Sequence, residues 1–438
     1  MSAEFVVAPS WLIPVEPAGM VLENHALVVG EGRILAILPR EDARQQWPEA
    51  HWLERADHAL IPGLINTHTH AAMNLLRGYA VDLPLEIWLG EHIWPAESRW
   101  TNAEFVRDGV DLAILEMIRG GTTCFQDMYM FPDEVAAVAA ERGIRAVTSI
   151  IVLEAATPWA RNADEYLTKG LAVHDCYRDH PLVSTAFGPH APYTVGNDAF
   201  RHIVTLANQL GMNIQIHLHE TATEVAQAEA ESGMRPLARL DALGLINTQL
   251  NAVHMTQLTP AEIELLAERG VHVVHCPESN MKLASGTCPV AKLLDAGVNV
   301  ALGTDGAASN NDLDMFGEMR RAALLAKLAA DDAQALPADS ALRMATLNGA
   351  KALGLDSETG SLVVGKAADM VCVNLATLAT QPVHNAVSQL VYSASRDQVS
   401  DVWVAGRQLY GEDGFTNADE QGVIARANVW LARMQQSS

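Results

Sequence analysis

The middle of the chain alternates short apolar runs with longer stretches that are rich in alanine and leucine. The apolar runs have the length of buried strands, and stretches such as Ala103–Arg119 and Pro260–Arg269 have the composition of helices. This alternation is typical of βα units around a parallel sheet. Eight such units predict an α/β fold, a TIM-like (β/α)8 barrel with its active site at the carboxyl ends of the strands. The predicted strands are Leu64–His70, Thr122–Met128, Arg145–Val152, Val183–His190, Asn213–His219, Asn251–Met255, Val271–Cys276 and Asn299–Asp305.

The two ends of the chain follow a different pattern, with short β-like runs separated by proline and glycine. The first part contains EFVVA, ALVVG and RILAIL, and the last part contains SLVVGKAADMVCVN and VSDVWVAGRQLY. We expect residues 1–57 and 357–438 to pair into one small β-sandwich domain. Residues 58–356 would then form the barrel beside it.

Composition narrows the class of protein. Of the 438 residues 49% are hydrophobic and 19% charged, which allows a sizeable core, and the formal net charge of −24 argues against nucleic acids and anionic membranes as partners. The N-terminus lacks the basic region of a signal peptide, and no apolar run reaches the ~18 residues of a transmembrane helix. Five scattered cysteines without a CxxC pair fit a reducing compartment. We therefore expect a cytoplasmic protein.

Histidines and an aspartate stand at the ends of three predicted strands. In PGLINTHTH, His68 and His70 are two positions apart, so both side chains point to the same face of a strand. His217 lies near the end of the run in IQIHLHE, and Asp305 ends the run in VALGTDGAASNN. Each segment alone would also fit a solvated strand end or, for Asp305, a turn or helix N-cap. Together they converge on one face of a barrel and predict a zinc site, although this ligand set also suits iron or manganese.

Other ionisable residues stand beside these candidates. Glu220 follows His217 by three positions, near enough to overhang the same site, where a glutamate can carry a proton. His190, His254 and His275 also close predicted strands. Single histidines at such positions are more often structural than functional, so these three are secondary candidates.

With these motifs the sequence resembles the amidohydrolase superfamily, and within it the 5-methylthioadenosine/S-adenosylhomocysteine deaminase group. The resemblance spans nearly the whole chain and is carried by PGLINTHTH, HLHE, HCPESN and GTDGAASNN, with GKAADMVCVN similar to the superfamily's returning sandwich domain. It implies one divalent metal ion per chain, with Zn²⁺ ahead of Fe²⁺ or Mn²⁺, and a homo-oligomer, either a dimer or a tetramer. The metal ligands that it implies are His68, His70, His217 and Asp305.

The resemblance also implies catalytic roles for Glu220, His254 and Asp305. Glu220 matches the group's proton-shuttling glutamate, which would protonate N1 of an adenine ring while water attacks C6. His254 matches a histidine that orients this water, and Asp305 would accept the water's proton. The residues expected to contact the substrate are Glu97, His190, Glu220, Trp88, Arg161 and Asp305.

Three of these residues concern the substrate beyond the reacting ring. Glu97, in PLEIWLGEHIWPAES, matches a carboxylate that accepts hydrogen bonds from ribose hydroxyls. Trp88 would form an apolar wall for the purine, although a core position on a helix face explains it equally well. Arg161, after the third predicted strand, would meet the carboxylate of an amino-acid-bearing substrate. The implied reaction is deamination of 5′-methylthioadenosine, S-adenosylhomocysteine or adenosine, giving the inosine-type product and ammonia.

One absence favours a single metal ion. Binuclear members of the superfamily bridge two metals with a carboxylated lysine, and neither Val183–Thr194 nor Arg145–Leu153 contains a lysine.

Two other functions stay open: a free-base deaminase (guanine, 8-oxoguanine or cytosine) or triazine hydrolase of the same superfamily, and a metal-free, non-catalytic scaffold. Glu97 favours a nucleoside, because a bare base has no ribose for it to hold.

Overall fold

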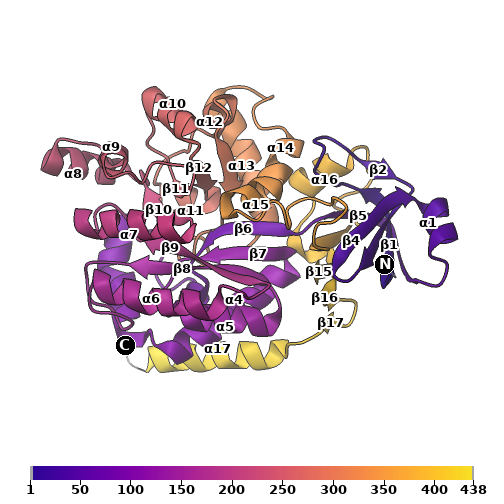
Figure 1. Cartoon of the computed structure of the whole chain (residues 1–438), viewed down its shortest axis with the longest axis horizontal. Helices are drawn as coiled ribbons and strands as arrows, with labels where there is room; N and C mark the ends of the chain where they lie inside the picture. The colour runs from indigo at the N-terminus through magenta and orange to yellow at the C-terminus, as the bar shows by residue number, and fades with distance from the viewer. Residues whose placement is uncertain (1–2, 437–438) are drawn as a thin grey trace.

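The computed structural model describes residues 3–436, and its larger part is a parallel barrel (Figure 1). Eight strands run in the order β13-β12-β11-β10-β9-β8-β7-β6. All eight match the predicted strands to within a few residues, and β8 matches at both ends. The strands are β6 (Leu64–Thr69), β7 (Thr122–Asp127), β8 (Arg145–Val152), β9 (Val183–Pro189), β10 (Ile214–Leu218), β11 (Leu250–His254), β12 (His272–His275) and β13 (Asn299–Leu302).

The barrel closes where the end of β13 meets β6. The amide of Asp305 donates to the carbonyl of His68 at 3.0 Å, and Thr67 Oγ1 donates to the Leu302 carbonyl at 2.6 Å. Gly303 lies in this seam, where a Cβ atom would come within 2.8 Å of the His68 amide nitrogen. A larger residue at 303 would force the strands apart. The seam therefore brings residues of the first and last strands to the same end of the barrel.

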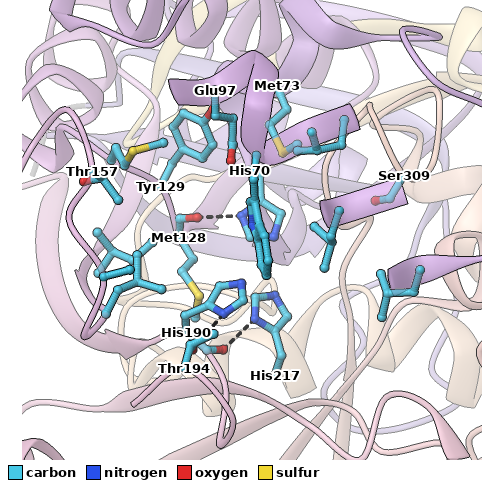
Figure 2. A pocket seen from close by; sticks show the side chains of 18 of the residues that line it. His70, Met73, Glu97, Met128, Tyr129, Thr157, His190, Thr194, His217 and Ser309 are labelled. Atoms are coloured by element: carbon cyan, nitrogen blue, oxygen red, sulfur yellow. Dashed lines mark hydrogen bonds between the residues drawn. The ribbon is translucent and has the colours of Figure 1, made fainter. Parts of the chain in front are cut away.

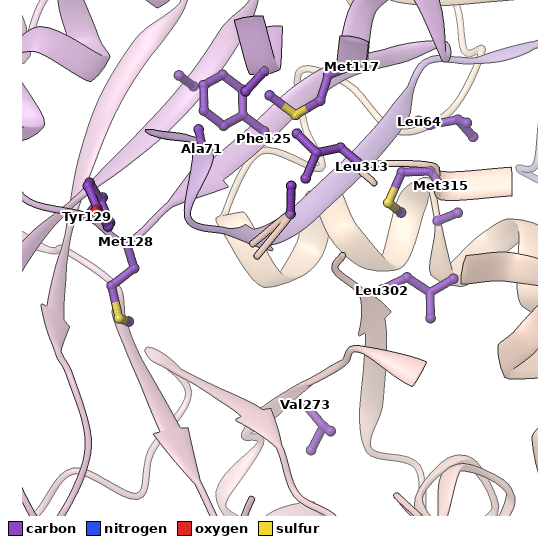
Figure 3. Packing of buried hydrophobic residues seen from close by; sticks show 14 of the residues in the cluster. Leu64, Ala71, Met117, Phe125, Met128, Tyr129, Val273, Leu302, Leu313 and Met315 are labelled. Carbon is purple, nitrogen blue, oxygen red and sulfur yellow. The ribbon is translucent and has the colours of Figure 1, made fainter. Parts of the chain in front are cut away.

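Helices surround the barrel and bury its apolar outer face; Figure 3 shows part of this packing, where side chains such as Met117 and Phe125 lie together. Local sequence starts several helices: the Asn102 side chain accepts the Phe105 amide, and Thr259 and Glu262 form a capping box. The helices of this part are η1 (Ala71–Leu76), α2 (Leu85–Ile87), η2 (Trp88–Ile93), α3 (Trp94–Trp100), α4 (Ala103–Arg119), α5 (Pro132–Arg142), α6 (Ala163–Tyr177), α7 (Asn197–Leu210), α8 (Ala222–Ser232), α9 (Pro236–Ala242), α10 (Pro260–Arg269), α11 (Pro277–Lys282), α12 (Val290–Asp295), α13 (Met315–Ala330), α14 (Ala338–Met344) and α15 (Leu347–Leu353).

The ends of the chain meet in a second, nine-stranded sheet with the order β17-β16-β15-β14-β5-β1-β3-β4, in which β2 also pairs with β1. Its N-terminal and C-terminal halves join where β5 and β14 pair antiparallel. The elements of this part are β1 (Phe5–Leu12), β2 (Leu22–Glu23), β3 (His25–Gly30), β4 (Arg33–Pro39), α1 (Arg40–Gln46), β5 (His51–Pro62), β14 (Met370–Asn374), α16 (Ala386–Tyr392), η3 (Arg396–Gln398), β15 (Val399–Val404), β16 (Arg407–Gly411) and β17 (Gly414–Phe415).

This second sheet curls around its own apolar core. The rings of Phe5 on β1 and Trp403 on β15 stack with centroids 6.0 Å apart, although β14 and β5 lie between those strands. The turn between β3 and β4 reaches the same side, where the Ala368 amide donates to the Gly32 carbonyl at 2.9 Å. Both terminal segments therefore contribute side chains to one apolar cluster, among them Val7, Leu27, Met370 and Trp403.

The C-terminal helix α17 (Glu420–Gln435) lies along the barrel rather than in the sheet (Figure 1). Trp430 Nε1 donates to Asp108 on α4 at 2.9 Å, and its ring meets Phe105 edge-on. Part of the segment 357–438, expected in the terminal domain, thus packs on the barrel, because α17 carries its own buried apolar side chains. Among residues 3–436, no helix combines the length and the apolarity needed to cross a membrane.

Candidate metal centre and active site

Three histidines and one aspartate converge at the carboxyl end of the barrel. The ligand atoms of His68, His70, His217 and Asp305 all lie within 4.8 Å of one another. His217 Nε2 is 3.2 Å from His68 Nε2, and Asp305 Oδ1 is 3.2 Å from His70 Nε2 and 3.5 Å from His68 Nε2. His70 and His217 face the same space in Figure 2. The four residues predicted as metal ligands therefore form one group, built from β6, β10 and the residues after β13.

Each histidine is held by its other ring nitrogen. His68 Nδ1 donates to Gln215 Oε1 at 2.9 Å, His70 Nδ1 to the Met128 carbonyl at 2.5 Å and His217 Nδ1 to the His190 carbonyl at 2.7 Å. These acceptors fix the proton on Nδ1 and leave the lone pair of each Nε2 pointing into the group. Metal-binding histidines are oriented in this way.

The chemistry of the four side chains fits a divalent cation. Burial lowers the pKa of His68 and takes that of His217 well below its ordinary value, so both rings stay neutral, the form in which imidazole binds metal. Burial opposes ionisation of Asp305, but the adjacent His68 and His70 outweigh it and hold the carboxyl pKa well below its ordinary value. Against the effect of burial, Asp305 in turn raises the pKa of His70 to about 9, so a bound cation would take the place of the proton on His70 Nε2. Two neutral Nε2 atoms 3.2 Å apart cannot hydrogen-bond each other, whereas a cation between them would satisfy both.

Gln215 orients the His68 ring through a hydrogen bond, and its loss should weaken metal binding. Its amide nitrogen donates to the Thr67 carbonyl at 2.8 Å, which aims its oxygen at His68. Loss of such an orienting partner weakens metal affinity about 10–100-fold. We expect Gln215→Leu to raise the zinc Kd by about that factor, measured by competition with a chromogenic chelator. Gln249→Leu, outside the barrel mouth, is the control, and equal affinities for both variants would contradict the assignment.

Asp305 has a fixed orientation. Its Oδ2 accepts hydrogen bonds from the hydroxyls of Ser279 and Ser309 at 2.7 and 2.8 Å, and its Oδ1 accepts the Gly306 amide at 2.8 Å. Its backbone has a φ of 61°, in the left-handed region that costs energy for a non-glycine residue. The surroundings therefore hold this carboxylate against His68 and His70.

Glu220 and His254 lie beside the four ligands. Glu220 Oε2 is 3.7 Å from His254 Nε2, and Ser285 Oγ donates to Glu220 Oε1 at 3.5 Å. Burial, helped by the negative charge of Asp305, raises the pKa of Glu220 to about 8. Burial lowers the pKa of His254 to about 4, and Asn280 Nδ2 donates to its Nδ1 at 3.0 Å. The pair thus presents a protonated carboxyl and a neutral imidazole whose Nε2–H is free to donate.

A cavity of about 920 Å³ opens over this group. Glu97 on α3 lines it, as does Tyr129. Burial raises the pKa of Glu97 against the opposing effects of the Tyr129 hydroxyl and of His70. Trp88 also lines the cavity, and its Nε1 donates to the Ala80 carbonyl at 3.2 Å, so it contributes to both the wall and the core. In Figure 2, Glu97 and Tyr129 lie on one side of His70.

Of the remaining candidates, His190 lines the cavity, whereas His275 and Arg161 do not. His190 lines the cavity, its ring centroid 5.0 Å from that of His217, and Thr194 Oγ1 lies 3.0 Å from its Nδ1. His275 is buried but is not part of the described cavity wall, and Arg161 is also outside it. The Arg161 side chain is 82% exposed and pairs with Glu165 at 2.6 Å. This geometry brings His190 to the site and leaves Arg161 at the surface.

Sequence reasoning missed several supporting residues. Gln215 stands two positions before His217, and this period of two was a usable sign that both face the barrel interior. Ser279 and Asn280 lie in the HCPESN motif, but only the structure shows that they reach Asp305 and His254.

Comparisons with known proteins connect the chain with amidohydrolases by family and with deaminases by the names of its relatives. The family model described as "Amidohydrolase family" matches residues 59–409. The 5-methylthioadenosine/S-adenosylhomocysteine deaminase of Teredinibacter turnerae is 48% identical over 98% of each chain, and the 5′-deoxyadenosine deaminase of Methanothermobacter thermautotrophicus is 44% identical over 86% of this chain and 87% of that one. A solved structure described as an adenosine deaminase from Xanthomonas campestris with bound zinc is 53% identical, covers 99% of each chain and superposes with a TM-score of 0.98.

Proposed function

The chain belongs to the amidohydrolase family, and from this premise we propose that it is a metal-dependent hydrolase that deaminates the adenine ring of 5′-methylthioadenosine, S-adenosylhomocysteine or adenosine. The predicted family and barrel fold are confirmed. We further propose one Zn²⁺ per chain, held by His68, His70, His217 and Asp305. The zinc-bound Xanthomonas campestris structure supports the choice of metal.

The chemistry divides among a few side chains. A divalent cation in this ligand group would act as a Lewis acid that lowers the pKa of water from about 15.7 towards about 7. Asp305 takes the proton of the attacking water, and His254, through its Nε2–H, orients that water towards C6 of the ring. Glu220, protonated near neutral pH, donates its proton to N1, so the ring does not carry a full negative charge during attack. The amino group then takes the proton held by Asp305 and leaves C6 as ammonia, while the new C6 hydroxyl returns its proton to Glu220, so that C6 becomes a carbonyl and both carboxyl groups regain their starting states.

One observation carries the proposal: an acid, Glu220, and a second carboxylate, Glu97, line one cavity together with His70, His217 and Asp305 of the ligand group. The acid suits proton transfer to a ring nitrogen, and Glu97 suits a pair of ribose hydroxyls. A non-catalytic scaffold has no need for such an acid above four converging ligands.

A substrate panel tests this proposal. Ammonia release by the zinc-loaded protein is measured with adenosine, 5′-methylthioadenosine and S-adenosylhomocysteine, and in parallel with guanine, 8-oxoguanine and cytosine. We expect turnover of the nucleosides and little of the free bases. Turnover of the bases alone would replace the proposed substrate class, and turnover of none by zinc-replete protein would favour the scaffold.

Glu97 should act on substrate binding. Charged hydrogen bonds of this kind contribute about 1.5–3 kcal/mol, so we expect Glu97→Gln to raise KM for adenosine about 10–100-fold with a smaller change in kcat. Steady-state kinetics measure both constants. Glu91→Gln, an exposed glutamate on the same segment, is the matched control. A fall in kcat alone would place Glu97 in the chemical step instead.

A further inference from the structure

The loop that follows β8 forms a separate part of the cavity wall. Residues 153–158 all line the cavity, together with Trp94 from α3. We refer to residues 153–158 and Trp94 together as the loop wall. Figure 2 shows Thr157 on the side opposite Ser309, with His70 between them. If the ring lies over the metal ligands and the ribose lies at Glu97, as proposed above, this loop wall is what a 5′-substituent meets.

The loop wall combines apolar surface with negative charge. Leu153, Ala156 and Trp94 are apolar, and the Trp94 side chain is partly open to solvent. The charged group of the wall is Glu154, which is fixed: its Oε1 accepts the Gly196 amide at 3.1 Å, at the start of α7. A Cβ at Gly196 would lie 2.7 Å from this oxygen, so only glycine leaves room for it.

The rest of the described cavity wall offers no cationic Lys or Arg side chain. Apart from the histidines and tyrosines, the ionisable side chains lining the described cavity are Glu97, Glu154, Glu220 and Asp305; Glu220 is the protonated acid and Asp305 belongs to the ligand group, so Glu154 is the charge that a group at the loop meets. The cation of the adjoining loop points elsewhere, because Arg161 is 82% exposed and shares Glu165 with Lys169. A carboxylate placed against the loop wall would therefore find no positive partner among the cavity-lining side chains, and it would face Glu154.

Resting on the proposed function, we propose that the loop wall selects among 5′-substituents by charge. It accepts short apolar groups such as methylthio, and amine-bearing groups that Glu154 can pair with. It discriminates against the α-carboxylate of an amino-acid substituent. Selection acts through Glu154 and the apolar surface, and Arg161 has no part in it.

Three substrates isolate the carboxylate. 5′-Methylthioadenosine, S-adenosylhomocysteine and the decarboxylated analogue of S-adenosylhomocysteine, which keeps the thioether and the amine, are compared by kcat/KM. We expect S-adenosylhomocysteine to fall below both others by about tenfold or more. Equal values for S-adenosylhomocysteine and its decarboxylated analogue would overturn this inference alone. Turnover of none of the three would overturn the proposed function together with it.

Two variants then locate the source of the selection. Glu154→Gln keeps the shape of the side chain and removes its charge, so we expect the ratio of kcat/KM for S-adenosylhomocysteine to that for its decarboxylated analogue to rise about fivefold or more. Arg161→Ala should leave this ratio unchanged. A selective loss of S-adenosylhomocysteine turnover in Arg161→Ala would overturn the inference and restore the sequence-based role of Arg161 as a carboxylate partner.

Discussion

Glu220→Gln should lower kcat for adenosine about 10³-fold while the protein keeps its metal. The substitution preserves shape but removes the acidic proton, and a well-placed general acid contributes about 10²–10⁴-fold. Glu220 lies 3.7 Å from His254 Nε2 and is not one of the four converging ligand residues. Loss of its proton should therefore affect the chemical step and leave metal binding intact. Single-turnover kinetics and elemental analysis of the same sample measure both quantities.

The matched control is Glu229→Gln, an exposed glutamate on the helix that follows Glu220. It should retain wild-type kcat. If Glu220→Gln lost metal and activity together, Glu220 would be part of the metal site rather than the acid. If it kept most of its kcat, another group would protonate the ring.

Removal of the metal should abolish turnover altogether. With the cation stripped by a chelator, water in the cavity has no Lewis acid to lower its pKa, which near 15.7 is about eight to nine units above the value of about 7 expected with zinc. We expect loss of more than about 10³-fold in kcat, and recovery when Zn²⁺ is added back. His217→Ala should show the same loss without recovery, because one of the facing Nε2 atoms is gone.

Thermal unfolding separates chemistry from folding in this experiment. Zinc that binds the folded state stabilises it by an amount that grows with the free zinc concentration relative to its Kd, so its return should raise the Tm of the wild type and have a much smaller effect on His217→Ala. Full activity in chelator-treated, metal-free protein would contradict the metal's role.

Much of the barrel can be predicted from the sequence because its strands are short apolar runs between helices. Strand β8 begins and ends where predicted, since buried residues fill all of Arg145–Val152. The secondary structure of the segment between β6 and α4 is harder to predict from the sequence. It contains a 3₁₀ helix, a π-helical turn over Trp88–Ile93 and the short helix with Glu97, none of which has a simple periodic pattern.

In the site, too, some features could be predicted from the sequence and others could not. The ligands were predictable because histidine and aspartate at strand ends are chemically distinctive. The groups that orient two of them are the carbonyls of Met128 and His190, and a carbonyl belongs to every residue, so the sequence carries no sign of these contacts. Tyr129 and Glu97 come from separate elements, and their meeting in one cavity wall depends on the three-dimensional path of the chain.

The central claim is that this zinc centre deaminates an adenine nucleoside. The most direct test is to incubate zinc-loaded protein with 5′-methylthioadenosine and adenosine and to follow the conversion of adenine to hypoxanthine together with ammonia release. We expect one ammonia for each hypoxanthine-type nucleoside formed, with loss of both signals in Glu220→Gln. Intact adenine nucleosides after incubation with fully zinc-occupied protein would contradict it.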